Sequence, residues 1–269
     1  MSFVEAIVLG LIQGITEFLP VSSDGHLALA GFLMEMRELP LSAVVLMHAG
    51  TLLATLLVMR RELVQLLEGS VSNDEGLFSA PRKELMGIVL ASIPTVIIGL
   101  SLEHSVSGWA QDPRIVGVCL LGTAGFLLLT RRPPGTEEVL RLRHYVAVGV
   151  AQGFAVLPGL SRSASTIALA MALGLSPRAA FRFSFLLSLP AVGGAVLLEG
   201  IKPEARASLD PMAAVGAVVA FFSGLVALLF LRRVISKGNF WSFALYVVPL
   251  GLGLLAWGLF GAGQPTAAP

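Results

Sequence analysis

The chain has 269 residues, of which 55% are hydrophobic and only 13% charged, and its mean hydropathy is +0.85. About a quarter of the residues of a typical soluble domain are charged, so this composition excludes an ordinary soluble globular protein and indicates an integral membrane protein. The formal net charge of +1 argues against a nucleic-acid partner, which needs a strongly basic face. The single cysteine, Cys119, excludes an intramolecular disulfide framework and a cysteine metal site.

The N-terminal apolar stretch differs from a cleavable signal peptide. It has no basic first region, it carries Glu5, and no small-x-small cleavage site precedes the polar residues that follow it. We therefore expect this stretch to belong to the mature fold.

Six further apolar stretches have about 17 to 22 residues, the length that crosses a bilayer core of about 30 Å. In chain order they are 41–59, 85–102, 114–130, 179–200, 211–231 and 241–261. The sequence therefore predicts six transmembrane helices.

Two other apolar regions, 3–35 and 144–175, are interrupted in the middle by proline and small polar residues. Each half has only about 12 to 17 residues, which is short for a crossing. Non-helical backbone at membrane depth is tolerated only where protein or a water-filled cavity surrounds it. We therefore expect each region to form a re-entrant helical hairpin.

The two interrupted regions also resemble each other. "GLIQGITEFLPVSS" (10–23) aligns with "GVAQGFAVLPGLS" (149–161), and both share G-x-x-Q-G followed by L-P and a serine. The G-x-x-x-G spacing within each indicates close helix contact. Each copy is a hairpin followed by three crossings, and an odd number turns the second copy upside down. The expected fold is thus an all-α polytopic single domain built as an inverted-topology repeat, with repeat 1 over about 1–130 and repeat 2 over about 144–262.

Basic residues should gather on the cytoplasmic side of a membrane protein. With this topology, thirteen lie on one side and four on the other. The larger group is Arg60, Arg61, Arg82, Lys83, Arg131, Arg132, Arg141, Arg143, Arg178, Arg182, Arg232, Arg233 and Lys237, and the smaller is Arg37, Arg114, Lys202 and Arg206. This asymmetry predicts that both termini face outward, that the first hairpin enters from outside, and that the second enters from the cytoplasm with its tip near the first.

Ionisable groups at membrane depth are costly, so their presence there indicates a functional site. The two hairpin tips hold such groups. The first tip contains Gln13, Glu17, Asp24 and His26, and the second contains Arg162. Gln13 and Glu17 are four residues apart and share one helix face. A guanidinium beside the start of a helix suits a phosphate group.

Structural explanations compete with these functional ones. A serine before an apolar helix is usually an N-cap, which is the expected role of Ser22, Ser161 or Ser165 taken singly. Glu17 as a hydrogen-bonded core carboxyl and His26 as an interfacial histidine are the alternatives for those two residues. The alternative for Arg162 is a structural role, in which it binds the carbonyl groups of the hairpin. His48, in an apolar crossing, could reach the site, although packing is the more common role of such a residue.

"QGITEFLPVSSDGH" together with "PGLSRSAST" resembles the two signature regions of the undecaprenyl-diphosphate phosphatase family, the bacitracin-resistance type of integral membrane phosphatase. The resemblance extends over essentially the whole chain, including "FRFSFLLSLPA". It implies hydrolysis of undecaprenyl diphosphate to undecaprenyl phosphate and phosphate, which recycles the lipid carrier for cell-wall synthesis. It also implies a divalent cation, Mg²⁺ or Ca²⁺, and the bacterial plasma (inner) membrane.

The family's motif residues fall on individual positions of this chain. Its Glu/Gln-x-x-x-Glu motif matches Gln13 and Glu17, its serine pair matches Ser22 and Ser23, and its histidine and arginine match His26 and Arg162. The resemblance departs at Asp24, where relatives usually carry Ser or Thr. A carboxylate at this position could restore the metal-binding charge that Gln13 does not supply. On this count of charges, the expected metal ligands are Glu17 and Asp24.

The expected catalytic residues are Glu17, Ser23, His26 and Arg162, and the expected substrate-binding residues are Gln13, Ser22, Ser161, Ser163, Ser165 and Thr166. Either Ser23, activated by His26 or Glu17, attacks phosphorus, or a water activated by the same groups does so. The sequence leaves both routes open.

The hairpin with the acid and the serine pair would open to the extracytoplasmic side. A polyprenyl-phosphate translocase (flippase) is the alternative function, because inverted repeats with broken helices suit alternating access. A phosphatase acting on another lipid phosphate is a second alternative. The expected partners are the polyprenyl diphosphate lipid and the bilayer, and a homodimer is left open.

Overall fold

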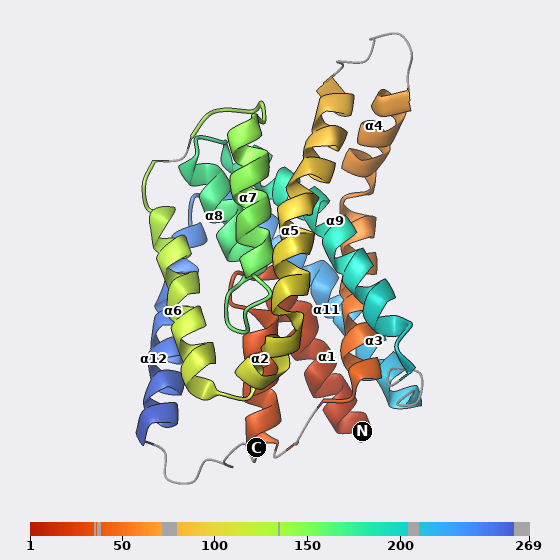
Figure 1. Ribbon diagram of the computed structural model, residues 1–269, viewed down its shortest axis with the longest axis vertical. Coiled ribbons are helices and arrows are strands. Elements are labelled where there is room, and N and C mark those ends of the chain that lie inside the picture. The colour runs from red at the N-terminus through yellow and green to blue at the C-terminus, as the bar shows by residue number, and fades with distance from the viewer. Residues whose placement is uncertain (35, 37–38, 72–79, 134, 204–209, 261–269) are drawn as a thin grey trace.

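The computed structural model describes residues 1–34, 36, 39–71, 80–133, 135–203 and 210–260. Within these ranges the chain forms helices and loops, with a single isolated parallel bridge between Glu137 and Leu175 (Figure 1). The helices are α1 (Phe3–Phe18), α2 (Ser23–Leu33), α3 (Leu41–Val58), α4 (Arg60–Val71), α5 (Ala80–Ala110), α6 (Pro113–Leu129), α7 (Leu142–Phe154), α8 (Arg162–Ala172), α9 (Pro177–Gly200), α11 (Pro211–Ser236), η1 (Phe240–Phe243) and α12 (Ala244–Phe260). The all-α prediction is confirmed.

Five helical stretches in the described residues are long and apolar enough to cross a membrane. They are α3, α5, α9, α11 and the continuous η1–α12 stretch, and each overlaps an expected crossing. The sixth expected crossing, 114–130, is α6, a shorter apolar helix of 17 residues. Expected positions that lie outside the described residues are Glu35, Arg37, Arg206 and the positions from 261 onward, where the last expected crossing and repeat 2 end.

Two boundaries differ from those expected. α5 runs for 31 residues, from Ala80 to Ala110, well beyond the apolar stretch 85–102. α4 was not expected as a helix at all. It follows α3 almost directly and mixes charged with apolar residues, so overall hydropathy does not mark it although one face is apolar.

The two interrupted regions form the helix pairs α1–α2 and α7–α8. α1 ends at Phe18, and its C-cap Leu19 is extended (ψ 144°) because the residue before a proline, here Pro20, avoids the helical region. Pro158 lies in the loop between α7 and α8. Figure 1 shows the α7–α8 loop lying part-way along the neighbouring long helices, not at an end of the bundle.

Close packing joins these short helices to the long ones. α1 packs on α11, which also packs on α3, while α7 packs on α5 and α6 packs on α12. A Cβ at Gly14 would lie 2.5 Å from the Ala220 carbonyl oxygen, and one at Gly149 would lie 2.2 Å from that of Ala91. The two G-x-x-x-G segments therefore make the close helix contacts expected from their spacing.

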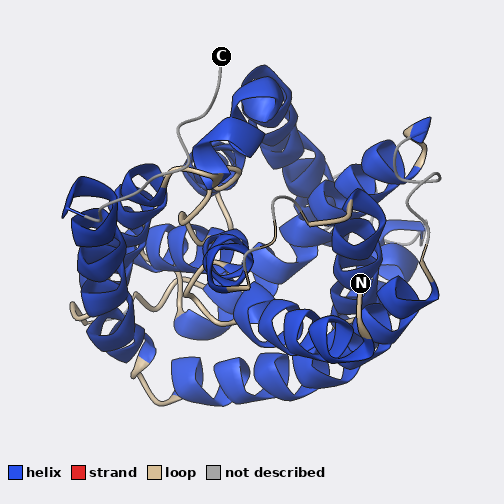
Figure 2. Cartoon of the chain, turned by 90° about the horizontal axis from the view of Figure 1, so that it is seen from below, coloured by secondary structure: helices blue, strands red, loops and turns tan. Residues whose placement is uncertain are grey.

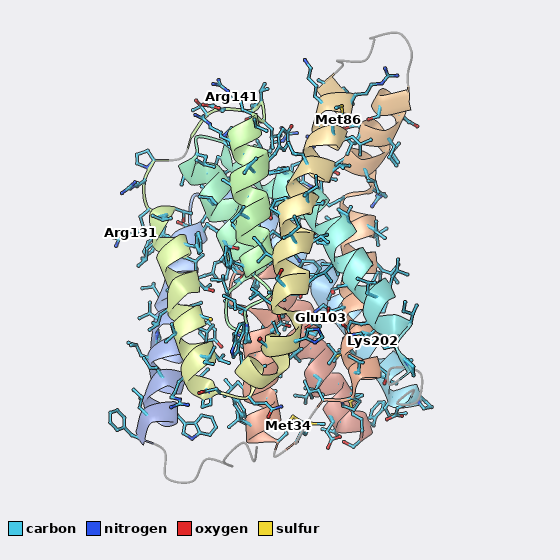
Figure 3. The ribbon with its side chains drawn as sticks, viewed as in Figure 1. Met34, Met86, Glu103, Arg131, Arg141 and Lys202 are labelled. Carbon is cyan, nitrogen blue, oxygen red and sulfur yellow. The ribbon has the colours of Figure 1, made fainter. Side chains whose placement is uncertain are left out.

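Viewed from the end at which α1 starts, the helices surround inner loop segments (Figure 2). The basic residues gather at the opposite end, where Figure 3 labels Arg131 and Arg141. Lys202 lies in the lower part of that view beside Glu103, and its Nζ donates to the carboxylate at 2.9 Å. The two ends of the bundle thus differ in charge.

Candidate functional site

Glu17, in the last turn of α1, connects the two interrupted regions. Its Oε1 accepts a hydrogen bond from Arg162 Nη2 of α8 at 2.7 Å. Its Oε2 accepts from Ser23 Oγ at 2.8 Å and from Gln13 Nε2 at 3.1 Å. One carboxylate therefore gathers three other predicted site residues, and the expected meeting of the two tips is confirmed.

The ion pair between Glu17 and Arg162 is largely removed from solvent. The side chain of Glu17 is 9% exposed and that of Arg162 is 15% exposed. The Arg162 guanidinium also lies over the Phe185 ring, 5.7 Å from its centroid. Removing one partner of a buried pair typically costs about 3 to 5 kcal/mol because the other charge is left uncompensated.

Among the residues that the structure describes, two buried polar atoms of this cluster find no hydrogen-bond partner. They are Gln13 Oε1 and Arg162 Nη1, both in direct contact with the Glu17 carboxylate through their other terminal atoms. An unsatisfied buried donor or acceptor costs about 1 to 3 kcal/mol, so each calls for an explanation. Arg162 Nη1 is a free donor for an anion, and Gln13 Oε1 is a free oxygen acceptor.

Ser22 locks the two loops together. Its Oγ accepts hydrogen bonds from the backbone N–H of Gly25 at 3.3 Å and of Gly159, in the other loop, at 3.1 Å. Its φ of 71° lies in the left-handed region, which costs about 1 to 3 kcal/mol for a residue with a side chain. Ser22 is the N-cap of α2, as the capping alternative expected, and its predicted substrate contact stays a prediction.

The loop before α8 is held by α6. Thr123 Oγ1 donates to the Gly159 carbonyl at 2.8 Å and accepts from the Ser161 N–H at 2.8 Å. Gly159 has a φ of +102°, and a Cβ there would lie 2.4 Å from the Val116 carbonyl oxygen. Only glycine fits this position without strain.

Ser161 and Ser163 are engaged at the start of α8. Ser161 Oγ accepts from the Ala164 N–H at 3.3 Å, which makes it the N-cap, and lies 3.2 Å from Ser163 Oγ. Both side chains are buried. The capping alternative for Ser161 is confirmed, while substrate binding by either serine stays a prediction.

Ser165 and Thr166 support the backbone of Arg162. Both hydroxyls donate to the Arg162 carbonyl, at 3.1 and 2.7 Å, and Thr166 Oγ1 also lies 2.6 Å from Ser184 Oγ of α9. These contacts fix the first turn of α8 and hence the guanidinium. Ser165 does not cap the helix. These contacts do not test substrate binding by Ser165 and Thr166, which stays a prediction.

His26 is turned toward α12. Its Nδ1 lies 2.7 Å from the Ser22 carbonyl, which can only accept, so Nδ1 carries the proton and the neutral ring accepts from the Tyr246 hydroxyl at Nε2, 2.9 Å away. In the described residues its polar contacts are thus with Ser22 and Tyr246, whereas Ser23 is bonded to Glu17. The catalytic role of His26 stays a prediction. Tyr246 escaped the sequence reading because it is a single phenol in an apolar crossing.

His48 reaches the site, which the sequence left open beside the packing role expected of it. Its Nδ1 lies 2.9 Å from the Val44 carbonyl and its Nε2 lies 3.8 Å from Glu17 Oε2. The contact with the carbonyl places the proton on Nδ1 in the neutral ring, so Nε2 faces the carboxylate as a proton acceptor. The separation is longer than a hydrogen bond, so His48 lies beside the carboxylate without bonding to it.

A narrow cleft between α3 and α9 opens beside this cluster. Its walls carry three hydroxyls that the sequence reading missed, those of Thr51, Thr55 and Ser188, together with Glu17 and Arg162. Thr51 and Thr55 lie in α3 and Ser188 in α9, and each hydroxyl donates to the backbone of its own helix. Such bonds are common in apolar helices, so the sequence did not single these residues out.

Comparison with known proteins identifies the chain. Residues 6–253 match the family described as bacitracin resistance protein BacA. The chain belongs to this family. The undecaprenyl-diphosphatase of Korarchaeum cryptofilum is 39% identical over 95% of this chain and 99% of its own. Those of Desulfosudis oleivorans and Syntrophotalea carbinolica are 41% and 40% identical, over 96% and 93% of this chain and 98% and 97% of their own.

The donor atoms near Glu17 fit a divalent cation that is completed by substrate and water. Within the described ranges no three His, Cys, Asp or Glu side chains are grouped as a metal site. Asp24, exposed in the first turn of α2, lies within electrostatic range of Glu17 and Arg162. With the unpartnered Gln13 Oε1, this BacA family member offers two carboxylates and one neutral oxygen. Mg²⁺ is commonly held by one or two carboxylates plus phosphate oxygens.

The Ser22 lock predicts a stability effect. Ser22→Ala leaves the N–H groups of Gly25 and Gly159 without their acceptor, so we expect a loss of about 1 to 3 kcal/mol and a lower thermal unfolding midpoint in detergent. Ser22→Gly should lose less, because it relieves the positive φ. Ser101→Ala, which removes an exposed hydroxyl bonded within its own helix, is the control. Equal midpoints for Ser22→Ala and Ser101→Ala would contradict the lock.

Proposed function

We propose that this chain hydrolyses undecaprenyl diphosphate to undecaprenyl phosphate and inorganic phosphate. One observation carries the proposal: a buried arginine with a free donor shares a carboxylate with a serine hydroxyl. The three BacA relatives above, which align over nearly their whole length, are named undecaprenyl-diphosphatases. Phosphoryl transfer depends chiefly on positioning and charge stabilisation, which this cluster can supply.

Arg162 is the residue that would bind the diphosphate. Its Nη2 is occupied by Glu17, which holds the guanidinium plane fixed, while Nη1 is free to donate to a phosphoryl oxygen. Fixed donors stabilise charge that develops during the reaction without reorganising. The same guanidinium would also neutralise the departing lipid phosphate.

Ser23 and Glu17 form the nucleophilic pair in this proposal. Ser23 Oγ–H points at Glu17 Oε2, so the carboxylate can take the proton as Oγ attacks the terminal phosphorus. Undecaprenyl phosphate then leaves, and water hydrolyses the phosphoserine to regenerate the hydroxyl. Gln13 Nε2 holds the same carboxylate oxygen, and His48 Nε2 lies 3.8 Å from it, placed to accept the proton onward.

Glu17 and Asp24, with Gln13 Oε1, are the residues that would hold the divalent cation. Such a cation neutralises phosphate charge and polarises the phosphoryl group when bound. These residues lie at the same tip as Ser23, which supports a shared site for the cation and the diphosphate. Asp24 would supply the negative charge that a glutamine at position 13 lacks.

Translocation of a polyprenyl phosphate, the alternative from sequence, finds no support. A head-group carrier needs the arginine but does not need a serine hydroxyl bonded to a carboxylate beside it. The relatives' names also refer to diphosphate hydrolysis.

We further propose six crossings, two re-entrant hairpins and an inverted repeat. The packing supports this arrangement, because α1 packs on α11 while its counterpart α7 packs on α5, the counterpart of α11. The twofold relation between the two repeats would likewise exchange α6 with α12, which pack on each other. Basic residues cluster where α3 ends and α9 begins, which favours that end as cytoplasmic in a bacterial plasma membrane, with the N-terminus and the Glu17 hairpin on the extracytoplasmic side.

The catalytic proposal predicts that Glu17→Gln and Arg162→Lys each lower phosphate release from undecaprenyl diphosphate by at least about 100-fold. The first removes the base and the second removes the planar fork that fits phosphate. The measurement is phosphate release by purified, detergent-solubilised protein. A metal chelator should abolish the wild-type activity, and added Mg²⁺ or Ca²⁺ should restore it.

The matched controls break exposed ion pairs by the same substitutions. Glu103→Gln loses the pair with Lys202, and Arg114→Lys alters the pair with Asp112. Both should retain wild-type activity, since exposed pairs contribute little. Wild-type rates in the two site variants, with a folded wild-type control, would refute the assignment.

The nucleophile is tested by Ser23→Ala. On the covalent route this variant loses essentially all turnover and no phosphoserine is trapped on rapid acid quench, whereas the wild type gives a phosphorylated peptide containing Ser23. Activity within about tenfold of the wild type would instead assign attack to water activated by Glu17.

The orientation is tested by thiol labelling in a Cys119→Ala background. One variant carries Gln111→Cys, just beyond the end of α5, and the other carries Asn239→Cys, at the basic end of the bundle. Both positions are exposed. An impermeant maleimide should label position 111 in intact cells and position 239 only after permeabilisation. The reverse pattern would overturn the proposed orientation.

A further inference from the structure

A second polar feature lies away from Glu17, at the basic end of the bundle. Here a cavity of about 990 Å³ opens between the start of α4, the start of α9 and the end of α11. Five arginines line it, against two glutamates, Glu62 and Glu138. We call it the arginine cavity; the lining arginines are Arg60, Arg61, Arg178, Arg182 and Arg232.

Two of these arginines are already engaged. Arg182 is paired with Glu84 of α5 at 2.5 Å, and Arg60 Nη1 donates to the Leu57 carbonyl at 2.7 Å. In the part of the chain that the structure describes, Arg61, Arg178 and Arg232 have neither an ion pair nor a hydrogen bond from the side chain. The cavity therefore holds three guanidinium groups without a direct partner, beside the carboxylates of Glu62 and Glu138.

These three groups come from three different helices, α4, α9 and α11. Basic residues at helix ends are usually anchors for the membrane surface, which is the expectation for the run "LRRVISK". Arg132, Arg233 and Lys237 at the same end are not among the residues that line the cavity. Convergence of Arg61, Arg178 and Arg232 on one cavity is a different arrangement.

The position of the cavity corresponds to the head-group level of a bilayer. α3 ends at Val58, α9 begins at Pro177 and α11 ends at Ser236, and all three are candidate membrane spans. Their ends meet at the cavity, whose apolar walls include Phe181 and Ile235. A phosphate at this level can contact the arginines while its acyl chains stay in the lipid.

The neighbouring helix α4 supports a lipid as the ligand. It is amphipathic, and Val64 and Leu67 on its apolar face are 47% and 48% exposed. Figure 1 shows α4 running on from α3 beside α5, so these apolar side chains lie next to the ends of the candidate spans, where acyl chains meet head groups. The cavity is thus bordered by a surface that acyl chains can cover, which a site for a free anion does not need.

We propose that the arginine cavity binds the phosphate head group of an anionic membrane lipid, at a site separate from Glu17 and Arg162. The guanidinium groups match phosphate oxygens in pairs. Basic pockets between membrane helices are suited to anionic head groups. The proposal does not depend on the hydrolytic activity.

The test compares two triple variants of the full chain in detergent. Arg61, Arg178 and Arg232 are replaced by Ala in one, and Arg132, Arg233 and Lys237 are replaced by Ala in the other, so the change in charge is identical. Binding of phosphatidylglycerol and of phosphatidylcholine is titrated by native mass spectrometry. Each arginine near the surface contributes enough that losing three should weaken phosphatidylglycerol binding roughly 100-fold in the cavity variant.

The expected result is tight phosphatidylglycerol binding by the wild type and the control triple, and its loss in the cavity triple with an unchanged thermal midpoint and hydrolysis rate. Equal binding by both triples would overturn the proposal, and so would equal loss in both, which means general charge attraction. Inorganic phosphate in excess distinguishes the sources. If it binds at the cavity arginines while the lipid does not, the site takes a free anion and the lipid assignment fails.

Discussion

The arrangement of the site depends on one buried ion pair. Glu17 and Arg162 lie at the tips of two helix pairs that enter the bundle from opposite ends, and neither charge could stay there alone, because desolvating an isolated ion costs several kcal/mol. Each charge therefore offsets the desolvation cost of the other. The pair also fixes the guanidinium and the carboxylate relative to each other before any substrate arrives, so binding a diphosphate does not have to order them.

Close backbone approach makes this pair possible. Glycines in α1 and α7 let those helices lie against α11 and α5, and the loops between the half-helices come within hydrogen-bonding distance of each other through Ser22 and Gly159. Ser22 keeps a left-handed backbone to do so. Strain of this kind persists where surrounding contacts over-determine the conformation, which is common at functional sites. The free donor of Arg162 and the free acceptor of Gln13 belong to the same group of costly features.

The long helices and the meeting of Glu17 with Arg162 could be predicted from the sequence. The physical reasons for this also explain which features could not be predicted. Apolar stretches of bilayer length located the long helices because hydropathy sums over many residues. α4 was missed, because the charged residues of a half-polar helix offset the hydropathy of its apolar residues. The joining of Glu17 to Arg162 followed from charges in two repeated, interrupted segments. His48, Tyr246 and Thr123 could not be placed, because one polar side chain in an apolar helix does not reveal which helix it faces.

Thr123 has a consequence for how the site keeps its shape. Through one hydroxyl that both donates and accepts, it satisfies the carbonyl of Gly159 and the N–H of Ser161. A segment without regular secondary structure is thereby attached to α6, and α6 packs in turn on α12. The helix pair α6 and α12 thus helps to align the reacting groups, although it contributes no charged side chain to them. The groups that react and the helices that hold their backbone therefore reside in different parts of the molecule.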